Sequence, residues 1–402
     1  MDYISTLIIL FFGIFFGIIT GLIPGVHINM ISMFLLSNFF ILSKIFEVNE
    51  IIVFIISMGI IHTFIDFIPS VLFGVPDSDT SLSILPAHKL VLNGEALKAI
   101  FLSSLGSFSG MIFAFFISPI FYFFLEDFYL FLKNIIPYFL GLVVVIFILF
   151  EKEKNQKFWA FIIVLFSSSL GLLILNSSLI SNPLLVIFSG MFGFASIIFA
   201  LKSKNKICKQ NLKFNFRFSK NYLKGLIFGG VSSAICAIAP GIGNAQAASL
   251  SSIFLKKLDS EIFLFILGSI NTINFILSFL TFYLIDRTRN GSVYVISQIV
   301  LEISFKELLF YFLIIFIVSI IGFFLSIYLG KILVKLVFKI NFKIVNLIVL
   351  IFLVFLIGFL SNIYGLLAFF CSGFLGLLCI SLGIRRVHMM SILIVPVILN
   401  LI

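Results

Sequence analysis

Long, uninterrupted runs of apolar residues recur along the chain and limit its fold more than any other feature. Most approach the roughly 20 residues that a helix needs to cross about 30 Å of hydrocarbon. They make the 402-residue chain 62% hydrophobic and only 10% charged. Because unpaired backbone amides are strongly disfavoured in lipid, the runs must form helices or a closed barrel, and their lack of alternation excludes the barrel. The sequence predicts an all-α integral membrane protein.

The spacing of the runs predicts about ten to twelve membrane segments in a single membrane domain, 1–402. The last two runs are long enough to hold two or more helices each. The predicted runs are 5–23, 28–46, 51–73, 98–125, 134–150, 157–177, 183–201, 223–240, 244–256, 261–285, 306–340 and 344–400. Four cysteines show no paired spacing suited to zinc, so we expect neither a disulfide nor a metal site.

Basic residues concentrate between two predicted spans. The stretch from Lys202 to Lys224 contains lysines and one arginine but no acid, and the chain has a net charge of +10. The positive-inside rule places loop 202–222 in the cytoplasm and the chain in the cell membrane as a multi-pass protein. A short basic loop between spans determines topology far more often than it binds nucleic acid, so we expect no nucleic-acid partner.

Two parts of the sequence align in the same order and predict an internal repeat. Pro24-Gly25 matches Pro240-Gly241 at an offset of 216, and Gly59 to Thr63 matches Gly268 to Thr272 at an offset of 209. An odd number of intervening crossings would make this an inverted repeat, an architecture typical of secondary transporters. The predicted division is repeat 1 at 7–130, linking spans at 131–201, the basic loop at 202–222, repeat 2 at 223–340 and C-terminal spans at 341–402.

Each Pro-Gly pair should end one helix inside the membrane and let another begin. The new helix N-terminus points free amides and the positive end of its dipole at the break, which suits an anion. Pro kinks that only shape the bundle are the alternative, but breaks at matched repeat positions favour a binding site. The candidate substrate-binding residues are Pro24, Gly25, His27, Asn29, Pro240, Gly241, Gly243, Asn244 and Gln246.

Ionisable residues within predicted spans are candidates for ion coupling. His62 and Asp66 lie four residues apart, on one helix face, where they could form a proton relay, an ion site or a neutral hydrogen-bonded pair. Asp77 and Asp79, in a polar loop or re-entrant segment, could bind a cation or cap a short helix. The candidate ion-coupling residues are His62, Asp66, Asp77, Asp79 and Asn271, with Na⁺ or H⁺ as the expected coupling ion and no cofactor.

Two pairs of arginines lie near predicted span ends. Arg287 and Arg289 follow Asp286 in the second-repeat counterpart of the Asp77 loop. They could clamp a carboxylate, although an Asp-Arg pair at a span end is more commonly an interface anchor. Arg385 and Arg386 near the C-terminus are first interpreted as a cytoplasmic anchor.

Four motifs occur in the order seen in one known family. They are Gly21-Leu22-Ile23-Pro24-Gly25-Val26-His27-Ile28-Asn29, Phe73-Gly74-Val75-Pro76-Asp77-Ser78-Asp79-Thr80 with Leu85-Pro86-Ala87-His88, Ala239-Pro240-Gly241-Ile242-Gly243-Asn244, and Arg385-Arg386-Val387-His388-Met389-Met390. The chain thus resembles the archaeal branch of the TctA family, the large membrane subunit of tripartite tricarboxylate transporters. The resemblance implies cation-coupled uptake of small carboxylates near the Pro-Gly regions. It also implies a small membrane subunit and an extracytoplasmic binding protein as partners.

The leading hypothesis is therefore a secondary active transporter, not an enzyme, that takes up a small organic anion by alternating access between its two repeats. No phosphate-binding loop or nucleophile elbow is present in the sequence. A translocase for a polyprenyl-phosphate type of lipid carrier is the first alternative, because helix N-termini bind phosphate as well as carboxylate. A membrane enzyme acting on lipid-linked groups is the second, and it would need Asp77, Asp79, His88 and Arg385 in one cleft.

Overall fold

The part of the chain that the structure describes is helical throughout apart from its connections. The computed structural model describes residues 3–23, 31–32, 35–36, 38–73, 84–151, 153–202, 209–238, 243–253, 259–337 and 342–402. No strand occurs among these residues. The predicted all-α class is confirmed.

The helices before the basic loop fall into two groups. The first group is α1 Tyr3–Leu22, α3 Phe39–Leu42, α4 Val48–Ile65, α5 Phe67–Phe73, α6 Ile84–Leu92 and α7 Ala96–Lys133. The second group is α8 Ile136–Leu149, α9 Lys154–Leu175, α10 Pro183–Phe188, the π-helix η1 Ser189–Phe194 and α11 Ala195–Lys202. Glu47 and Glu50 form a capping box that starts α4, and Pro137 and Pro183 occupy first-turn positions, where a missing amide hydrogen breaks no helical bond.

The helices after the basic loop also fall into two groups. The first is α12 Lys220–Ile238, α13 Asn244–Ile253, α14 Ser260–Ile285, α15 Gly291–Ile299 and α16 Phe305–Val337. The second is α17 Phe342–Ser381, the 3₁₀ helix η2 Arg386–Met390 and α18 Ser391–Leu401. Run 306–340 is long enough to hold two or more helices, but it forms the single helix α16 of 33 residues, which contains no Pro.

By contrast, α17 is interrupted at Asn362, whose backbone has φ 62° and ψ −170°. Leu366 lies against Gly358, eight residues earlier, although a continuous helix would separate those positions by about 12 Å. The Asn362 side chain accepts hydrogen bonds from the amides of Tyr364 and Gly365, at 3.0 and 3.3 Å. The side chain thereby caps the second half of α17 and stabilises a helical hairpin.

Eight of the described helical stretches are long and apolar enough to cross a membrane. Three shorter apolar helices accompany them: Ile136–Leu149, Pro183–Phe199 and Arg386–Leu401. Large apolar side chains on α1, α7, α8, α9, α16 and α17 point outward, as lipid-facing helices require, whereas α4 and α14 are almost completely enclosed by other helices. The chain is a multi-pass membrane protein, as its composition predicts.

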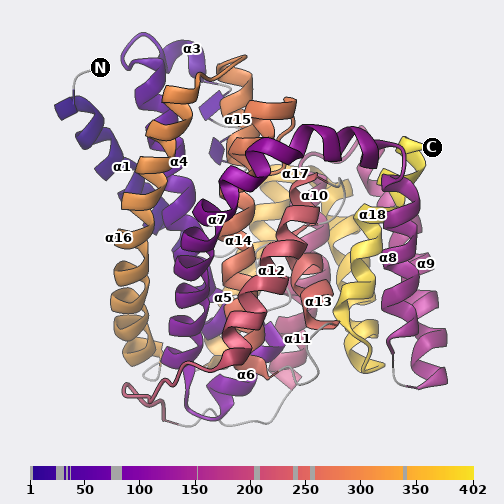
Figure 1. Cartoon of the computed structure of the whole chain (residues 1–402). Coiled ribbons are helices and arrows are strands. Elements are labelled where there is room, and N and C mark those ends of the chain that lie inside the picture. The colour runs from indigo at the N-terminus through magenta and orange to yellow at the C-terminus, as the bar shows by residue number, and fades with distance from the viewer. Residues whose placement is uncertain are drawn as a thin grey trace.

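The bundle has two apolar cores that lie side by side (Figure 1). The larger core joins α1 to α7 with α12 to α16, and α4 and α14 pass through its centre. The smaller core joins α9, α10, η1, α11, α17 and α18. A small apolar cluster connects the two cores and consists of Val143, Phe147, Leu250 and Val387.

Small residues let the central helices approach closely. On α14, the space beside Gly268 is filled by the backbone of Ser103 in α7, and Ser107 Oγ donates to the Gly268 carbonyl at 3.1 Å. Gly110 of α7 lies against the Ser269 backbone in the same way. Because a side chain at Gly268 or Gly110 would collide with backbone, the contact between α7 and α14 depends on glycine at both positions.

Candidate functional site

The predicted site residues divide into those that the structure describes and those outside the described residues. Those outside are Pro24, Gly25, His27, Asn29, Asp77, Asp79, Pro240 and Gly241. Gln246 belongs to α13, but its side chain is outside the description. Gly243 and Asn244 lie at the start of α13, His62 and Asp66 in and directly after α4, and Asn271 in the middle of α14.

The helix break predicted in repeat 2 lies between α12, which ends at Ile238, and α13, which begins at Asn244. Asn244 is buried, and its side-chain oxygen accepts a 2.6 Å hydrogen bond from the amide of Asn274 on α14. The sulfur of Cys236 in α12 lies 3.7 Å from the carbonyl oxygen of Gly243. The first turn of α13 is therefore held between α12 and α14, deep in the larger core.

Asn271 lies one helical turn before Asn274, on the same side of α14. Its side chain is 2% exposed, and neither its amide nitrogen nor its oxygen has a hydrogen-bond partner. The side-chain oxygen of Asn274 has no hydrogen-bond partner either. Leaving a buried polar group unpaired costs about 1–3 kcal/mol, so these amides point to a bound polar ligand or water.

Arg289 reaches the same break from the turn between α14 and α15. Its guanidinium Nη2 donates to the Ile238 carbonyl, the last of α12, at 2.8 Å. The backbone amides of Arg289 and Asn290 both donate to Ser278 Oγ at 3.0 Å, which ties the turn to α14. Arg287 is exposed, whereas Arg289 is half-buried. The sequence left two roles open for both arginines, a carboxylate clamp and an interface anchor.

His62 contacts α1 rather than its neighbour on α4. Its Nδ1 lies 3.0 Å from the hydroxyl of Thr20, and both side chains are buried. Asp66 is also buried and ends α4, and Ser70 Oγ donates to its backbone carbonyl at 3.0 Å. Among the described residues no ion pair joins His62 to Asp66 directly. Their proposed role in ion coupling stays a prediction.

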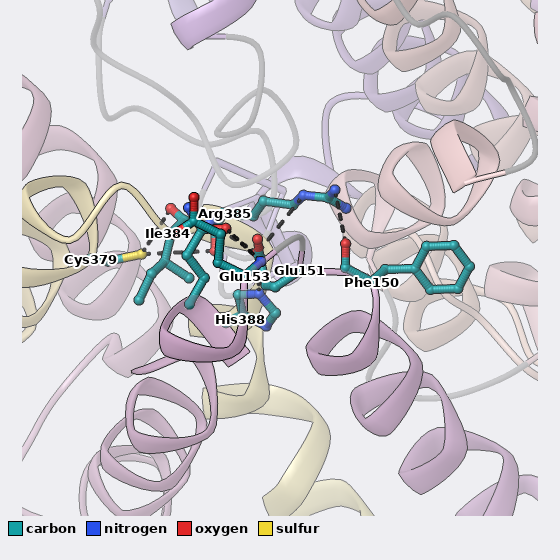
Figure 2. Close-up of polar contacts among 8 residues, drawn as sticks. Phe150, Glu151, Glu153, Cys379, Ile384, Arg385 and His388 are labelled. Atoms are coloured by element: carbon teal, nitrogen blue, oxygen red, sulfur yellow. Dashed lines mark hydrogen bonds and ion pairs between the residues drawn. The ribbon is translucent and has the colours of Figure 1, made fainter. Parts of the chain in front are cut away.

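The C-terminal arginine motif forms a second polar cluster, shown in Figure 2. His388 Nε2 lies 2.8 Å from Glu151 Oε1, and Arg385 Nε lies 3.8 Å from the same oxygen. Arg385 also donates to the Phe150 carbonyl at 3.2 Å. Burial alone would raise the pKa of Glu151, but the hydrogen bond and charge of His388, together with Arg385, lower the pKa below its ordinary value.

Arg386, next in the motif, is 5% exposed, and its Nη1 donates to the hydroxyl of Ser196 in the first turn of α11 at 2.9 Å. A headgroup anchor requires an exposed guanidinium, so the interpretation of this motif as a cytoplasmic anchor is wrong for Arg386. The motif instead ties the α8–α9 connection and α11 to the C-terminal helices. Arg385 and His388 face the Glu151 carboxylate, whereas Arg386 forms no ion pair among the described residues.

The enzyme alternative needs His88 and Arg385 in one cleft. His88 belongs to α6, which packs on α5, α7 and α14. Arg385 precedes η2, which packs on α8, α9, α13, α17 and α18. The two residues thus belong to different helix groups, and the described residues hold no cluster of His, Cys, Asp or Glu suited to a metal.

Two surface hollows are apolar and lie away from both polar clusters. One, of about 630 Å³, lies between α7 and α16 and is lined mainly by Phe and Leu. The other, of about 290 Å³, lies between α1 and α4. Apolar walls suit lipid chains better than an anion, so the polar site is the buried break and not these hollows.

These features define a multi-pass α-helical membrane protein with polar groups at an interrupted helix in its centre. The chain belongs to the tripartite tricarboxylate transporter TctA family, whose model matches residues 7–391. It is 34% identical over 313 residues to an uncharacterised protein of Methanocaldococcus jannaschii, covering 77% of this chain and 76% of that protein. No solved structure matches the chain. The family is a transporter family, and its members are components of tricarboxylate transporters.

Proposed function

We propose that this protein is the membrane carrier of a secondary transporter that takes up a small organic anion, such as a di- or tricarboxylate, together with Na⁺ or H⁺. The observation that supports it most is the α12–α13 break, where Asn244, Asn274 and the unpaired Asn271 meet inside the larger core. Membership of a tricarboxylate transporter family supports the substrate class.

The physical basis is the N-terminus of α13. The first amides of a helix have no partner within the helix and carry a partial positive charge. In a buried site with low dielectric, those amides attract an anion more strongly than they would in water. A carboxylate bound there would also accept hydrogen bonds from the amide groups of Asn271 and Asn274. The proposed site thus consists of the backbone amides of α13 and the side-chain amides of α14.

Matched contacts support the proposed repeat. Gly17 of α1 lies against Ile61 of α4. In the repeat alignment, the counterpart of Gly17 is Ser233 of α12 (offset 216), and the counterpart of Ile61 is Ile270 of α14 (offset 209). These two residues are also in contact, because Ser233 Oγ donates to the Ile270 carbonyl at 3.4 Å. Helix α1 thus packs on α4 through the same positions as α12 on α14.

The long helices exchange partners between the proposed repeats. Helix α7 of repeat 1 packs on α14 of repeat 2 through Gly110, and α16 of repeat 2 packs on α4 of repeat 1 through Gly322, against Phe64. This reciprocal arrangement is what a two-fold relation between repeats produces, and it supports rocking of one repeat against the other as the transport movement. We also propose the cytoplasmic side for loop 202–222, and a small membrane subunit and a binding protein as partners.

Thermal stabilisation of the purified protein tests the proposal. The ligands are citrate, succinate, inorganic phosphate and a polyprenyl phosphate, each with and without Na⁺ and at two pH values. We expect stabilisation by a carboxylate that needs the cation, that Asn244→Ala abolishes and that the exposed control Asn400→Ala retains. Stabilisation by the polyprenyl phosphate alone would replace the carboxylate carrier with the lipid translocase.

A further inference from the structure

The described part of the two proposed repeats contains few lysine or arginine side chains that are shielded from the surface. Lys98 and Arg289 are the lysine and arginine side chains there that are not exposed. Lys98 is neutralised, because its Nζ lies 2.5 Å from Glu261 and 3.4 Å from Glu95. Arg289 forms no ion pair with any carboxylate of the described residues, and its buried Nε has no hydrogen-bond partner. Its positive charge is therefore available to a ligand.

The turn that carries Arg289 contacts both proposed repeats. At one end, Arg289 donates to Ile238, the last residue of α12 before the second break. At the other end, Ser292 Oγ lies 3.3 Å from Ser32 Oγ of repeat 1. Asp286, in the left-handed conformation, reverses the chain after α14 so that Ser278, two turns back, can hold the amides of the turn. Arg289 therefore lies beside Ser278, two turns before the end of α14, and not beyond the helix end.

A capping role alone does not account for Arg289. The bond to Ile238 uses one of the five N–H donors of the guanidinium, and a single uncharged donor such as Gln could make it. A half-buried guanidinium without a counterion is poorly stabilised, and its planar fork of donors matches a carboxylate. The unpaired Asn271 is a second, independent sign of a ligand at this place.

We propose that Arg289 binds one carboxylate of the substrate, while the N-terminus of α13 and the Asn271 and Asn274 amides bind a second one. The inference rests on the proposed function and narrows it to organic anions with at least two carboxylates. A molecule with one carboxylate would leave either the guanidinium or the helix N-terminus without its anion. Arg289 is then the residue that discriminates by charge.

The test compares succinate with succinamate, which has the same length but one carboxylate replaced by a neutral amide. Dissociation constants are measured by calorimetry on the purified full-length protein and on Arg289→Gln, Arg289→Lys and Arg287→Gln. Arg287 is a matched control, because it is an exposed arginine two residues away. Unfolding midpoints without ligand report any loss of structure.

We expect wild type to prefer succinate, and Arg289→Gln to bind succinate about 10- to 100-fold more weakly, the loss expected for a hydrogen bond to a charged group, while succinamate changes little. Arg289→Lys should lose less, because it keeps the charge but not the fork. Arg287→Gln should bind both ligands as wild type does.

If Arg289→Gln keeps the wild-type preference for succinate over succinamate, the inference about Arg289 is overturned, but the proposed carrier function is not. Equal weakening of both ligands, with a lower unfolding midpoint, assigns Arg289 a structural role and also overturns it. A wild type that binds no carboxylate overturns the proposed function itself.

Discussion

Buried amide side chains dominate the polar chemistry at the second helix break. Asn274 donates to Asn244 at 2.6 Å, and both are enclosed by apolar helices. Replacing Asn274 with alanine leaves the Asn244 oxygen buried without a donor. We expect the free energy of unfolding to fall by about 1–3 kcal/mol, which thermal unfolding in detergent would measure. The exposed Asn400→Ala should leave the midpoint unchanged, and an unaltered Asn274→Ala would show that the hydrogen bond contributes nothing to stability.

The Glu151 carboxylate gives the second prediction at this scale. Because its pKa in the folded protein is below the ordinary value of 4.5, the ionised form stabilises the fold. This contribution is complete above pH 4.5 and is lost as the pH falls through the lowered pKa. We expect Glu151→Gln to lower the unfolding free energy at pH 7 by about 2 kcal/mol, the size of a hydrogen bond to a charged group. The variant should also remove part of the acid destabilisation between pH 5 and 3.

Unfolding curves across that pH range, with the exposed Glu126→Gln as control, would measure the effect. An acid profile of Glu151→Gln that runs parallel to wild type would contradict it. Arg385 and His388 both face the Glu151 carboxylate, so their variants should reduce the same pH-dependent part.

Sequence reasoning found some of these residues and missed others for identifiable reasons. Asn244 and Asn271 could be proposed as site residues because helix periodicity and the repeat alignment can both be seen in the sequence. The pairing of Glu151 with His388 joins residues 237 positions apart and leaves no local signal. Arg289 was recognised as a possible clamp, but its burial depends on the chain reversal at Asp286, which the sequence does not reveal.

At the scale of elements, apolar runs predict helices well because each span needs a similar length of apolar chain. They fail where length alone must be interpreted. Run 306–340 is long enough to hold two or more helices but forms the single helix α16. The break in α17 falls at Asn362, whose side-chain oxygen accepts hydrogen bonds from backbone amides that follow it, and no Pro marks the site.

The contact between α7 and α14 gives a prediction at this scale. A methyl group at Gly268 would collide with the backbone of Ser103, which cannot move aside as a flexible side chain could. We expect Gly268→Ala to destabilise the protein by about 1–3 kcal/mol through overpacking. Gly141→Ala in α8 meets no atom within 4 Å and should be neutral or slightly stabilising, since alanine favours helix. Equal unfolding midpoints for the two variants would show that α7 and α14 can separate freely.

At the scale of the whole molecule, the two cores have different characters. The larger core holds both proposed repeats, and the smaller one, with the Glu151 cluster, lies beside it and touches α13 through Leu250 and Val387. The sequence predicted the order of the segments but not this lateral arrangement, because packing between distant helices is decided by shape complementarity rather than by periodicity. In the proposed transport movement, the smaller core would stay fixed while the repeats of the larger core move against it.

The proposed movement makes a prediction that depends on the whole bundle. Ser32 and Ser292 lie on different proposed repeats, with hydroxyl oxygens 3.3 Å apart. Cysteines at both positions, in a background with the four native cysteines replaced, are close enough for a disulfide after oxidation. If the two repeats separate during each transport cycle, the disulfide should stop citrate or succinate uptake into proteoliposomes, and reduction should restore it.

The single variant Ser292→Cys, oxidised in the same way, controls for damage by the oxidant. Mass spectrometry establishes how much of the double variant is cross-linked, so that the remaining uptake can be compared with the uncross-linked fraction. Uptake that persists at the full rate in completely cross-linked protein would mean that Ser32 and Ser292 stay together throughout the cycle. The repeats would then move as one body around this contact, and access to the site would have to alternate through other helices.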